Sequence, residues 1–125
     1  MGVQFNEEKP IYMQIAEMLE NAIFCGAYQE EEQIPSITEL AVAHKINPAT
    51  ALKGINVLVD EDLLYKKRGL GMFVSKGASA KIRQKRQKNF YVQYILPMVQ
   101  EAVNLDITNE QLDAMIERGY QENGH

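Results

Sequence analysis

Basic side chains are concentrated in the middle of the chain, between residues 45 and 88. This span holds eleven of the thirteen lysines and arginines but only three acidic residues, which gives it a local charge of +8. The whole chain has a formal net charge of −4, so the remaining residues carry −12. Because phosphate binding depends on the local patch more than on the total charge, the span predicts a surface for DNA. A basic face that is only solvated is the alternative.

Catalytic and metal-binding chemistry is not indicated. The histidines are His44 and His125, and Cys25 is the single cysteine. No Cys/His cluster has metal-site spacing, and no serine or cysteine stands with a histidine in a recognised local motif. We therefore expect no enzyme, no metal and no cofactor. His44 is expected to end a helix as a partner of its dipole, and Cys25 to be a buried small hydrophobe rather than a redox sensor.

Composition sets the remaining bounds. A chain of 125 residues with 46% hydrophobic content predicts one folded domain, or one domain with a small appendage. No apolar run approaches the ~18 residues of a membrane span, and the first ten residues lack the features of a signal peptide. A single cysteine fits a reducing compartment. We expect a cytoplasmic protein.

Two short helices are predicted to position the polar residues of the basic span. Ser36 and Glu39 have the spacing of a capping box, which begins a helix that ends near His44. Asn47 suits an N-cap and Pro48 suits the first helical position, so a second helix is predicted from Pro48 to about Asp60. Together they form a helix-turn-helix pattern.

The second helix has a buried and an outer face. Its buried face is expected to contain Leu52, Ile55, Leu58 and Val59, and its outer face Ala49, Thr50, Lys53 and Asn56. Small and polar residues near the start of such a helix allow it to enter a major groove, where Lys53 can reach a phosphate or a guanine edge. A plain helical hairpin with a solvated outer face is the alternative.

A β-hairpin is predicted directly after these helices. Residues 63–66 and 72–74 have strand character, and the glycines of Arg68-Gly69-Leu70-Gly71 permit a tight turn. Lys66, Lys67 and Arg68 then lie at its tip, where they can reach the sugar-phosphate backbone or a minor groove. A hairpin in this position is typical of the wing of a winged helix.

These motifs, in this order, resemble the GntR family of bacterial transcription regulators. The resemblance covers residues 10 to 74 and rests on four segments: 10–15, 34–41, 46–50 and 63–74. The Asn-Pro helix start and the short tail after the wing are similar to the YtrA-type subgroup. The resemblance implies a winged helix-turn-helix, a two-helix tail that mainly dimerises, and control of a transporter operon.

The resemblance also implies DNA contacts at particular positions. Thr38 stands where the family often has an arginine, and Leu70 where a polar or basic residue is common. The candidate DNA-binding residues are Ser36, Thr38, Asn47, Ala49, Thr50, Lys53, Lys66, Lys67, Arg68, Gly69 and Gly71.

The flanking segments are expected to support this unit. Residues 1–9 are predicted to be an extended arm, followed by a helix from Pro10 to Cys25 whose apolar face contains Ile11, Ile15, Leu19, Ala22 and Ile23. Residues 75–79 are predicted to be a linker. A long helix over 80–104 should be kinked by Pro97, and its first turns carry cations that oppose the helix dipole. We therefore interpret Arg83, Lys85 and Arg86 as contacts to flanking phosphates.

The C-terminal segment carries more apolar surface than two helices can bury alone. Thr108 and Gln111 form a second capping-box pattern that begins the last helix. Packing on a second copy would cover the apolar face, so we predict a homodimer. A small ligand pocket is the alternative use. The candidate interface residues are Phe90, Tyr91, Tyr94, Ile95, Met98, Leu112, Met115 and Ile116.

The sequence therefore predicts a mainly α fold with a small β-hairpin. A winged helix-turn-helix DNA-binding domain is expected over 1–75, and a helical dimerisation or regulatory tail over 76–125. The predicted function is that of a sequence-specific transcriptional regulator, a dimeric repressor on a short inverted repeat of double-stranded DNA. An effector is left unknown. A winged-helix protein-interaction module without a specific DNA target is the alternative function.

Overall fold

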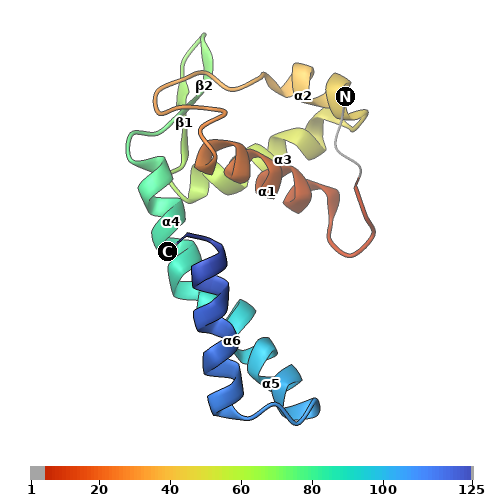
Figure 1. Ribbon diagram of the computed structural model, residues 1–125. Coiled ribbons are helices and arrows are strands. Elements are labelled where there is room, and N and C mark those ends of the chain that lie inside the picture. Colours follow the sequence, from red (N-terminus) through yellow and green to blue (C-terminus); the bar gives the residue numbers. More distant parts are fainter. Residues whose placement is uncertain (1–4, 125) are drawn as a thin grey trace. The chain divides into compact units, whose positions relative to one another are not determined.

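The computed structural model describes residues 5–124, and the chain separates into two compact units, Met1–Gln84 and Lys85–His125. The first unit contains α1 (Ile11–Phe24), α2 (Ile37–His44), α3 (Pro48–Asp60), β1 (Leu64–Lys67), β2 (Gly71–Val74) and the start of α4 (Ala78–Phe90). The second contains the end of α4, the π-helix η1 (Tyr91–Ile95), α5 (Leu96–Asn104) and α6 (Asn109–Glu122) (Figure 1). The order of the first unit, three helices followed by a hairpin, confirms the predicted winged helix-turn-helix.

The core of the first unit is made by the inner faces of its helices and the base of the hairpin. α1 contributes Ile15, Leu19 and Ile23, and α3 contributes Ile55 and Leu58, all of them almost fully buried. Leu63, Leu64 and Val74 close the core from the hairpin side. The helical spacing of these apolar residues is what packs α1 along α3 (Figure 1).

The hairpin is antiparallel, with Leu64 opposite Val74 and Lys67 opposite Gly71. A short segment, residues 31–34, lies on the other side of β2. Gln33 forms an isolated antiparallel bridge with Phe73, and the Ile34 amide donates to the Met72 carbonyl at 3.0 Å. The wing is therefore supported on its β2 edge by the connection between α1 and α2.

Three predicted burials are wrong. Cys25 is exposed, because it is the C-cap residue beyond the last turn of α1 rather than part of its buried face. Leu52 is 42% exposed and Ile11 is 43% exposed. On α3 the inner face is instead completed by Ala51 and Gly54, which allow α1 to come close.

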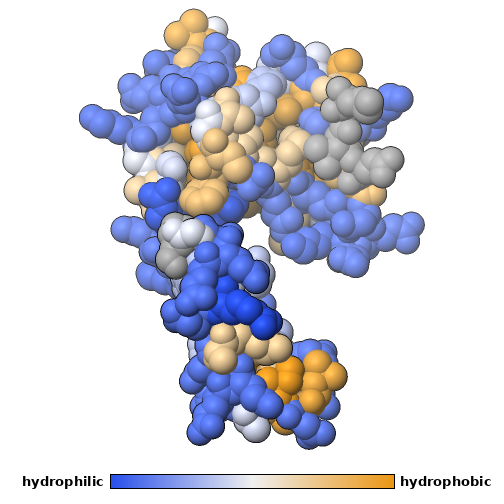
Figure 2. All heavy atoms as spheres, viewed as in Figure 1, coloured by the Kyte–Doolittle hydropathy of each residue, from blue (hydrophilic) through white to orange (hydrophobic). Residues whose placement is uncertain are grey.

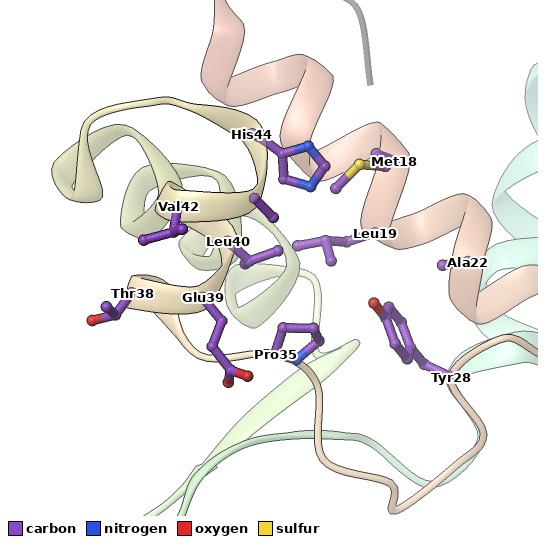
Figure 3. A pocket seen from close by; sticks show the side chains of 11 residues that line it. Met18, Leu19, Ala22, Tyr28, Pro35, Thr38, Glu39, Leu40, Val42 and His44 are labelled. Atoms are coloured by element: carbon purple, nitrogen blue, oxygen red, sulfur yellow. The ribbon is translucent and has the colours of Figure 1, made fainter. Parts of the chain in front are cut away.

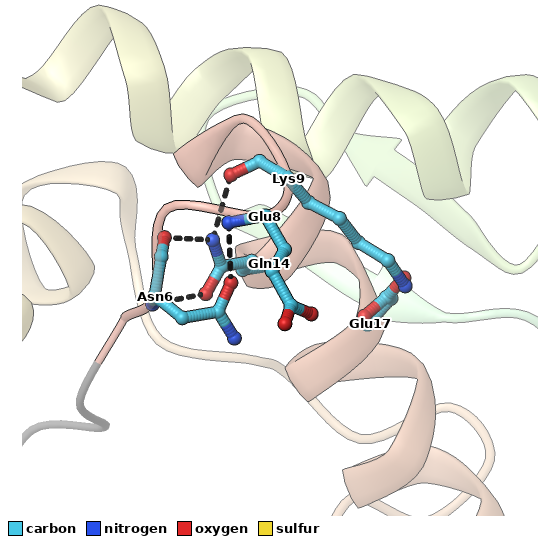
Figure 4. A network of polar contacts seen from close by, with 5 residues as sticks. All are labelled: Asn6, Glu8, Lys9, Gln14 and Glu17. Atoms are coloured by element: carbon cyan, nitrogen blue, oxygen red, sulfur yellow. Dashed lines mark hydrogen bonds and ion pairs between the residues drawn. The ribbon is translucent and has the colours of Figure 1, made fainter.

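The segment before α1 folds back onto that helix over its described part, residues 5–9. Gln14 fixes it: its side-chain amide donates to the carbonyls of Asn6 and Lys9 at 2.8 and 2.7 Å, and its Oε1 accepts from the Asn6 amide at 3.1 Å (Figure 4). Phe5 packs against the core. The expected extended arm is thus wrong for residues 5–9, and its residues 1–4 lie outside the described part.

The predicted linker over 75–79 is also wrong. α4 begins at Ala78, and Ala78 and Ile82 are both fully buried in the core of the first unit. The Ser75 amide donates to the Leu63 carbonyl at 2.9 Å, and the Gly77 amide donates to the Glu30 carboxylate. The chain therefore passes from the wing into α4 through packed, hydrogen-bonded structure.

The long C-terminal helix changes type just before Pro97, while the expected kink at Pro97 stays a prediction. The five residues of η1 precede α5, and Pro97 occupies the first turn of α5. Since proline has no N–H to donate, a local π-helix is one of the ways a helical run accommodates it. Thr108 then caps α6 with Gln111 in the predicted capping box.

The second unit buries very little of its apolar surface. Among the described residues from 85 onward, Ala102 is the one buried side chain. Tyr91, Tyr94, Val103, Leu105 and Tyr120 are all more than half exposed, and Figure 2 shows hydrophobic surface in the region of α5. Within residues 5–124, no helix combines the length and the apolar character needed to cross a membrane.

Candidate nucleic-acid interface

α2 begins with a complete capping box at the candidate residue Ser36. The Ser36 Oγ accepts from the Glu39 amide at 3.0 Å, and the Glu39 carboxylate accepts from the Ser36 amide at 2.9 Å. Two hydrogen bonds that the Glu39 carboxylate accepts lower its pKa, first the one from the Ser36 backbone amide and then one from the Ser36 side chain. The Ser36 hydroxyl thus takes part in the cap, and its role as a DNA contact stays a prediction.

The turn between α2 and α3 is tight. Lys45 adopts a left-handed conformation with φ of 55°, and the Ile46 amide donates back to the Ala41 carbonyl at 3.0 Å. Asn47 then caps α3: its Oδ1 accepts from the Ala49 amide at 2.8 Å, and Pro48 occupies the first turn. The predicted start of α3 is confirmed. Ala49 is exposed there and Thr50 is half-buried.

Gly54 sets the distance between α3 and α1. A Cβ atom at this position would lie 2.8 Å from the Ile15 Cγ2 and 2.9 Å from the Tyr12 carbonyl oxygen. Only a glycine fits this contact without a shift of the two backbones. The close packing places the outer face of α3 directly beside the N-terminal turn of α1.

Tyr12 uses this proximity to contact Lys53. The Lys53 Nζ lies 4.1 Å from the centroid of the Tyr12 ring, and Lys53 is otherwise exposed. Such a cation–π contact restricts where the ammonium group lies while leaving its charge in place. Sequence reasoning assigned Tyr12 only to a family motif, because nothing in the spacing of α1 and α3 residues indicates that these two side chains meet.

The wing carries its cations at the end of the hairpin. Lys66, Lys67 and Arg68 are exposed, and Gly69 has a φ of +79°, which the turn requires. The Lys67 Nζ lies 4.3 Å from the centroid of the Phe73 ring. An aromatic side chain on the neighbouring strand therefore orients one of the predicted phosphate contacts.

The cations at the start of α4 contact protein groups. The Arg83 guanidinium lies 5.7 Å from the Phe24 ring centroid, and the Lys81 Nζ donates to the Asp62 carbonyl at 3.4 Å. Lys85 and Arg86 are half-buried. Arg83 belongs to the first unit, and Lys85 and Arg86 to the second. Their interpretation as phosphate contacts stays a prediction.

A groove of about 730 Å³ lies on the first unit between α1, α2 and the connection that joins them (Figure 3). Its lining includes Met18, Ala22, Tyr28, Pro35 and Val42. The lining is mostly apolar, and the Glu39 carboxylate in it already caps α2. This groove lies on the first unit. The ligand pocket considered as an alternative would instead use aromatic and methionine side chains of the C-terminal segment.

No group of three His, Cys, Asp or Glu side chains that could hold a metal ion occurs within the described part of the chain. His44 ends α2 as predicted, and its ring centroid lies 6.0 Å from that of Phe5. His125 lies outside the described residues.

The first unit thus brings together the candidate DNA-binding residues. They lie on four local features: the α2 N-terminus, the turn to α3, the outer face of α3 and the wing. The candidate dimer residues lie in the second unit. Their roles stay predictions, but the fold and the polar, basic surface together define the class of the protein, a winged helix-turn-helix transcriptional regulator.

The sequence comparisons specify the family. The model described as "Bacterial regulatory proteins, gntR family" matches residues 11–74. The chain belongs to the GntR family, whose members are DNA-binding transcriptional regulators and not enzymes. This confirms the resemblance and the expectation that the protein is not an enzyme.

Two curated relatives from Bacillus subtilis (strain 168) are similar to this chain. The transcriptional repressor NagR is 38% identical over 76 residues, which are 61% of this chain and 31% of NagR. The transcriptional repressor YtrA is 32% identical over 69 residues, 55% of this chain and 53% of YtrA. The expected likeness to YtrA is confirmed. The chain spans about a third of NagR and about half of YtrA in these matches.

Two solved structures are also similar. A putative transcriptional regulator of the GntR family from Bacteroides thetaiotaomicron is 31% identical, with a TM-score of 0.73 over 90% of this chain and 98% of that one. The DNA-binding domain of AraR in complex with operator ORX1 is 30% identical, with a TM-score of 0.57 over 60% of this chain and 96% of that one. The match with AraR falls on a domain solved with operator DNA.

Proposed function

We propose that this chain is a dimeric transcriptional repressor that binds a short inverted repeat in double-stranded DNA. The observation that carries the proposal is the pairing, in one compact unit, of a capped α3 N-terminus with a cationic wing. A helix with this start and this outer face fits a major groove, and the wing cations fit the adjacent backbone.

Lys53 is the proposed direct reader of the half-site. It lies on the outer face of α3 beside Thr50 and is oriented by the Tyr12 ring. A lysine in this place can donate to guanine O6 and N7 or to a phosphate. Ser36 and Thr38 at the start of α2 are proposed to hold the backbone on the other side of the groove, and Lys66, Lys67 and Arg68 to hold it at the wing.

Dimerisation is proposed for the second unit. Its exposed apolar side chains, Tyr91, Tyr94, Val103, Leu105 and Tyr120, form more hydrophobic surface than a small helical unit normally leaves in water. A second copy of the same surface would cover it in an isologous interface. Two heads joined in this way would read two half-sites, which is why we propose an inverted repeat.

Repression and the choice of operon rest on relatives. NagR and YtrA are both named as transcriptional repressors. The resemblance to the YtrA type supports a transporter operon as the target, and a cytoplasmic location follows from a role on DNA.

Selection of binding sites tests the proposal. The purified full chain is incubated with a genomic DNA library at physiological salt, beside the Lys53→Ala variant. Arg118→Ala, which removes an exposed cation from α6 in the second unit, serves as the charge-matched control. We expect one palindromic site that the wild type and Arg118→Ala recover and Lys53→Ala loses.

The other outcomes are informative as well. Binding that is unspecific and disappears near physiological salt would contradict the proposal and favour a protein-interaction module. A specific site without internal symmetry would contradict the inverted repeat, and a monomer at micromolar concentration in sedimentation would contradict the dimer. Transcription from a promoter that carries the recovered site, with and without the protein, then separates repression from activation.

A further inference from the structure

Gln33 lies in the segment 31–34 between α1 and α2, where it forms the bridge with Phe73 of the wing. Three backbone hydrogen bonds hold this segment against β2. The Ile34 amide donates to Met72, the Val74 amide to Glu32 and the Glu31 amide to Val74, at 3.0, 2.9 and 2.7 Å. These bonds fix the base of the wing but do not reach its tip.

The side chain of Gln33 extends the support to the wing turn. Its Nε2 donates to the carbonyl oxygen of Leu70 at 2.6 Å, across 37 positions of the sequence. Leu70 belongs to the turn itself, since its amide donates to the Lys67 carbonyl at 2.9 Å. Gln33 is exposed, so this bond is not a means of satisfying a buried polar group. The bond instead restricts the position of the wing turn.

Gly71 is shaped to admit this contact. It has a φ of +123°, and a Cβ atom placed on it would lie 2.7 Å from the Gln33 Nε2. A side chain at position 71 would therefore both strain the backbone and push the amide away from Leu70. Gly69, which has a φ of +79°, has no neighbour within 4 Å of the equivalent position. The two glycines of the turn thus have different roles, and only Gly71 makes room for another side chain.

The contact connects two parts of the candidate interface. On one side, Gln33 is three positions before Ser36, the N-cap residue of α2. On the other side, Gln33 binds Leu70, which is two positions after Arg68 in the cationic tip of the wing. A shift of the wing turn relative to α2 would have to break the bond between Gln33 and Leu70.

We propose that Gln33 is a positioning residue for DNA binding, which holds the cationic tip of the wing at a fixed place relative to α2 and α3. The inference rests on the proposed function, because it assigns Gln33 a role in the same interface. Gln33 itself need not touch DNA. Its contribution is to order the tip before binding, so that less conformational freedom is lost when Lys66, Lys67 and Arg68 meet phosphates.

The first test needs no DNA. Gln33→Met keeps the length of the side chain and removes its donor, and Gln29→Met is the matched control at an exposed glutamine of the same connection. In hydrogen-exchange measurements on the full chain, we expect faster exchange at residues 66–72 in Gln33→Met and unchanged exchange in Gln29→Met. The Leu70 amide, which bonds to Lys67, is the most direct reporter. Equal exchange in the wild type and Gln33→Met would overturn the proposal.

The second test asks whether Gln33 acts through the wing. With mixed-sequence duplex DNA at low salt as the probe, we expect Gln33→Met to bind about threefold to tenfold more weakly than the wild type, the range that one hydrogen bond accounts for. In a variant with Lys66, Lys67 and Arg68 all replaced by alanine, the same substitution should have no further effect. Combined with Lys53→Ala, it should retain its full effect.

A merely structural role would not produce this pattern. A loss that is multiplicative with the wing variant would overturn the proposal, because Gln33 would then act by another route. Binding of Gln33→Met at wild-type strength would overturn it as well. If the wild type bound no DNA at all, the proposed function would fail, while the exchange measurement would still decide whether Gln33 orders the wing.

Discussion

The two units of this protein solve the burial of apolar side chains differently. In the first, α1, α3, the hairpin and the start of α4 enclose a continuous core in which Ile15, Leu58 and Val74 are almost inaccessible to water. In the second, Tyr94, Leu105 and Tyr120 remain more than half exposed. Very small units bury a smaller share of their surface on folding and usually need additional support from disulfides, metals or oligomerisation. The first unit thus has an enclosed core, and the exposed apolar surface of the second supports the proposal that it packs on a second copy.

The largest effect is expected in the core of the first unit. Leu58→Ala removes a fully buried side chain of α3 and should lower the free energy of unfolding by about 2–5 kcal/mol. The matched control is Val42→Ala on α2, since Val42 is 74% exposed and such a site usually changes stability by less than ~0.5 kcal/mol. Urea unfolding followed by circular dichroism measures both.

The concentration dependence of this loss is a second expectation. If the first unit is complete, the effect of Leu58→Ala is the same at low and high protein concentration. An effect that disappears at high concentration would mean that the core of the first unit also depends on a second copy, and the contrast between the units would be lost.

The second prediction concerns the exposed apolar side chains of the other unit. Tyr94→Glu places a charge on η1 at a ring that is 61% exposed and stacks on Phe90 at 5.3 Å between centroids. If this surface is a dimer interface, dimerisation should weaken by more than about thirtyfold, as at an interface hot spot. Gln93→Glu, which adds the same charge at the exposed neighbouring residue, is the control.

Sedimentation velocity over a range of concentrations separates the two variants. A dimer that tolerates Tyr94→Glu as well as it tolerates Gln93→Glu would place the interface elsewhere. A monomeric wild type would break the comparison itself, since the second unit would then be stable with its apolar face in water.

Local signals explain why most of the fold was predicted from sequence. The capping residues Ser36, Asn47 and Thr108, with Pro48 after Asn47, mark the starts of three helices, because each acts on backbone amides within three positions. The wing was predicted for the same reason: its glycines define a turn by conformation alone. These are interactions between near neighbours, which periodicity and motif reasoning can detect.

The errors arose where the answer depends on residues far apart in the chain. Leu52 has the apolar character of a core residue, but the face of α3 that packs on α1 contains Ala51 and Gly54, and Leu52 stays 42% exposed. Residues 75–79 have the composition of a linker, but Ala78 is buried against the first unit. The contacts of Lys53 with Tyr12 and of Gln33 with Leu70 join distant positions too, so no local pattern predicts them.

The smallest expected effect is a difference in pH dependence between the helix caps of the two units. Both have a capping box, but its third helical residue is Glu39 in the first unit and Gln111 in the second. The hydrogen bonds from Ser36 lower the pKa of Glu39 below its ordinary value of 4.5. A carboxyl whose pKa is lowered by folding contributes stability that is present above its unfolded pKa and lost as the pH falls through its folded pKa. The α2 cap should therefore weaken in acid, and the α6 cap, whose Gln111 does not titrate, should not.

Exchanging the two residues tests this difference directly. Glu39→Gln should make the α2 cap insensitive to acid, and Gln111→Glu should make the α6 cap sensitive, while the capping geometry is kept in both. The readout is the exchange rate of the Ser36 and Thr108 amides, which donate to these side chains at 2.9 Å each, corrected for the intrinsic pH dependence of exchange. A Ser36 amide that loses no protection in acid, or a Thr108 amide that gains no acid sensitivity in Gln111→Glu, would contradict the assignment of the effect to the carboxylate. Because each unit then serves as the control of the other, a general loss of stability in acid, which moves both amides in every variant, is separated from titration of the single capping group.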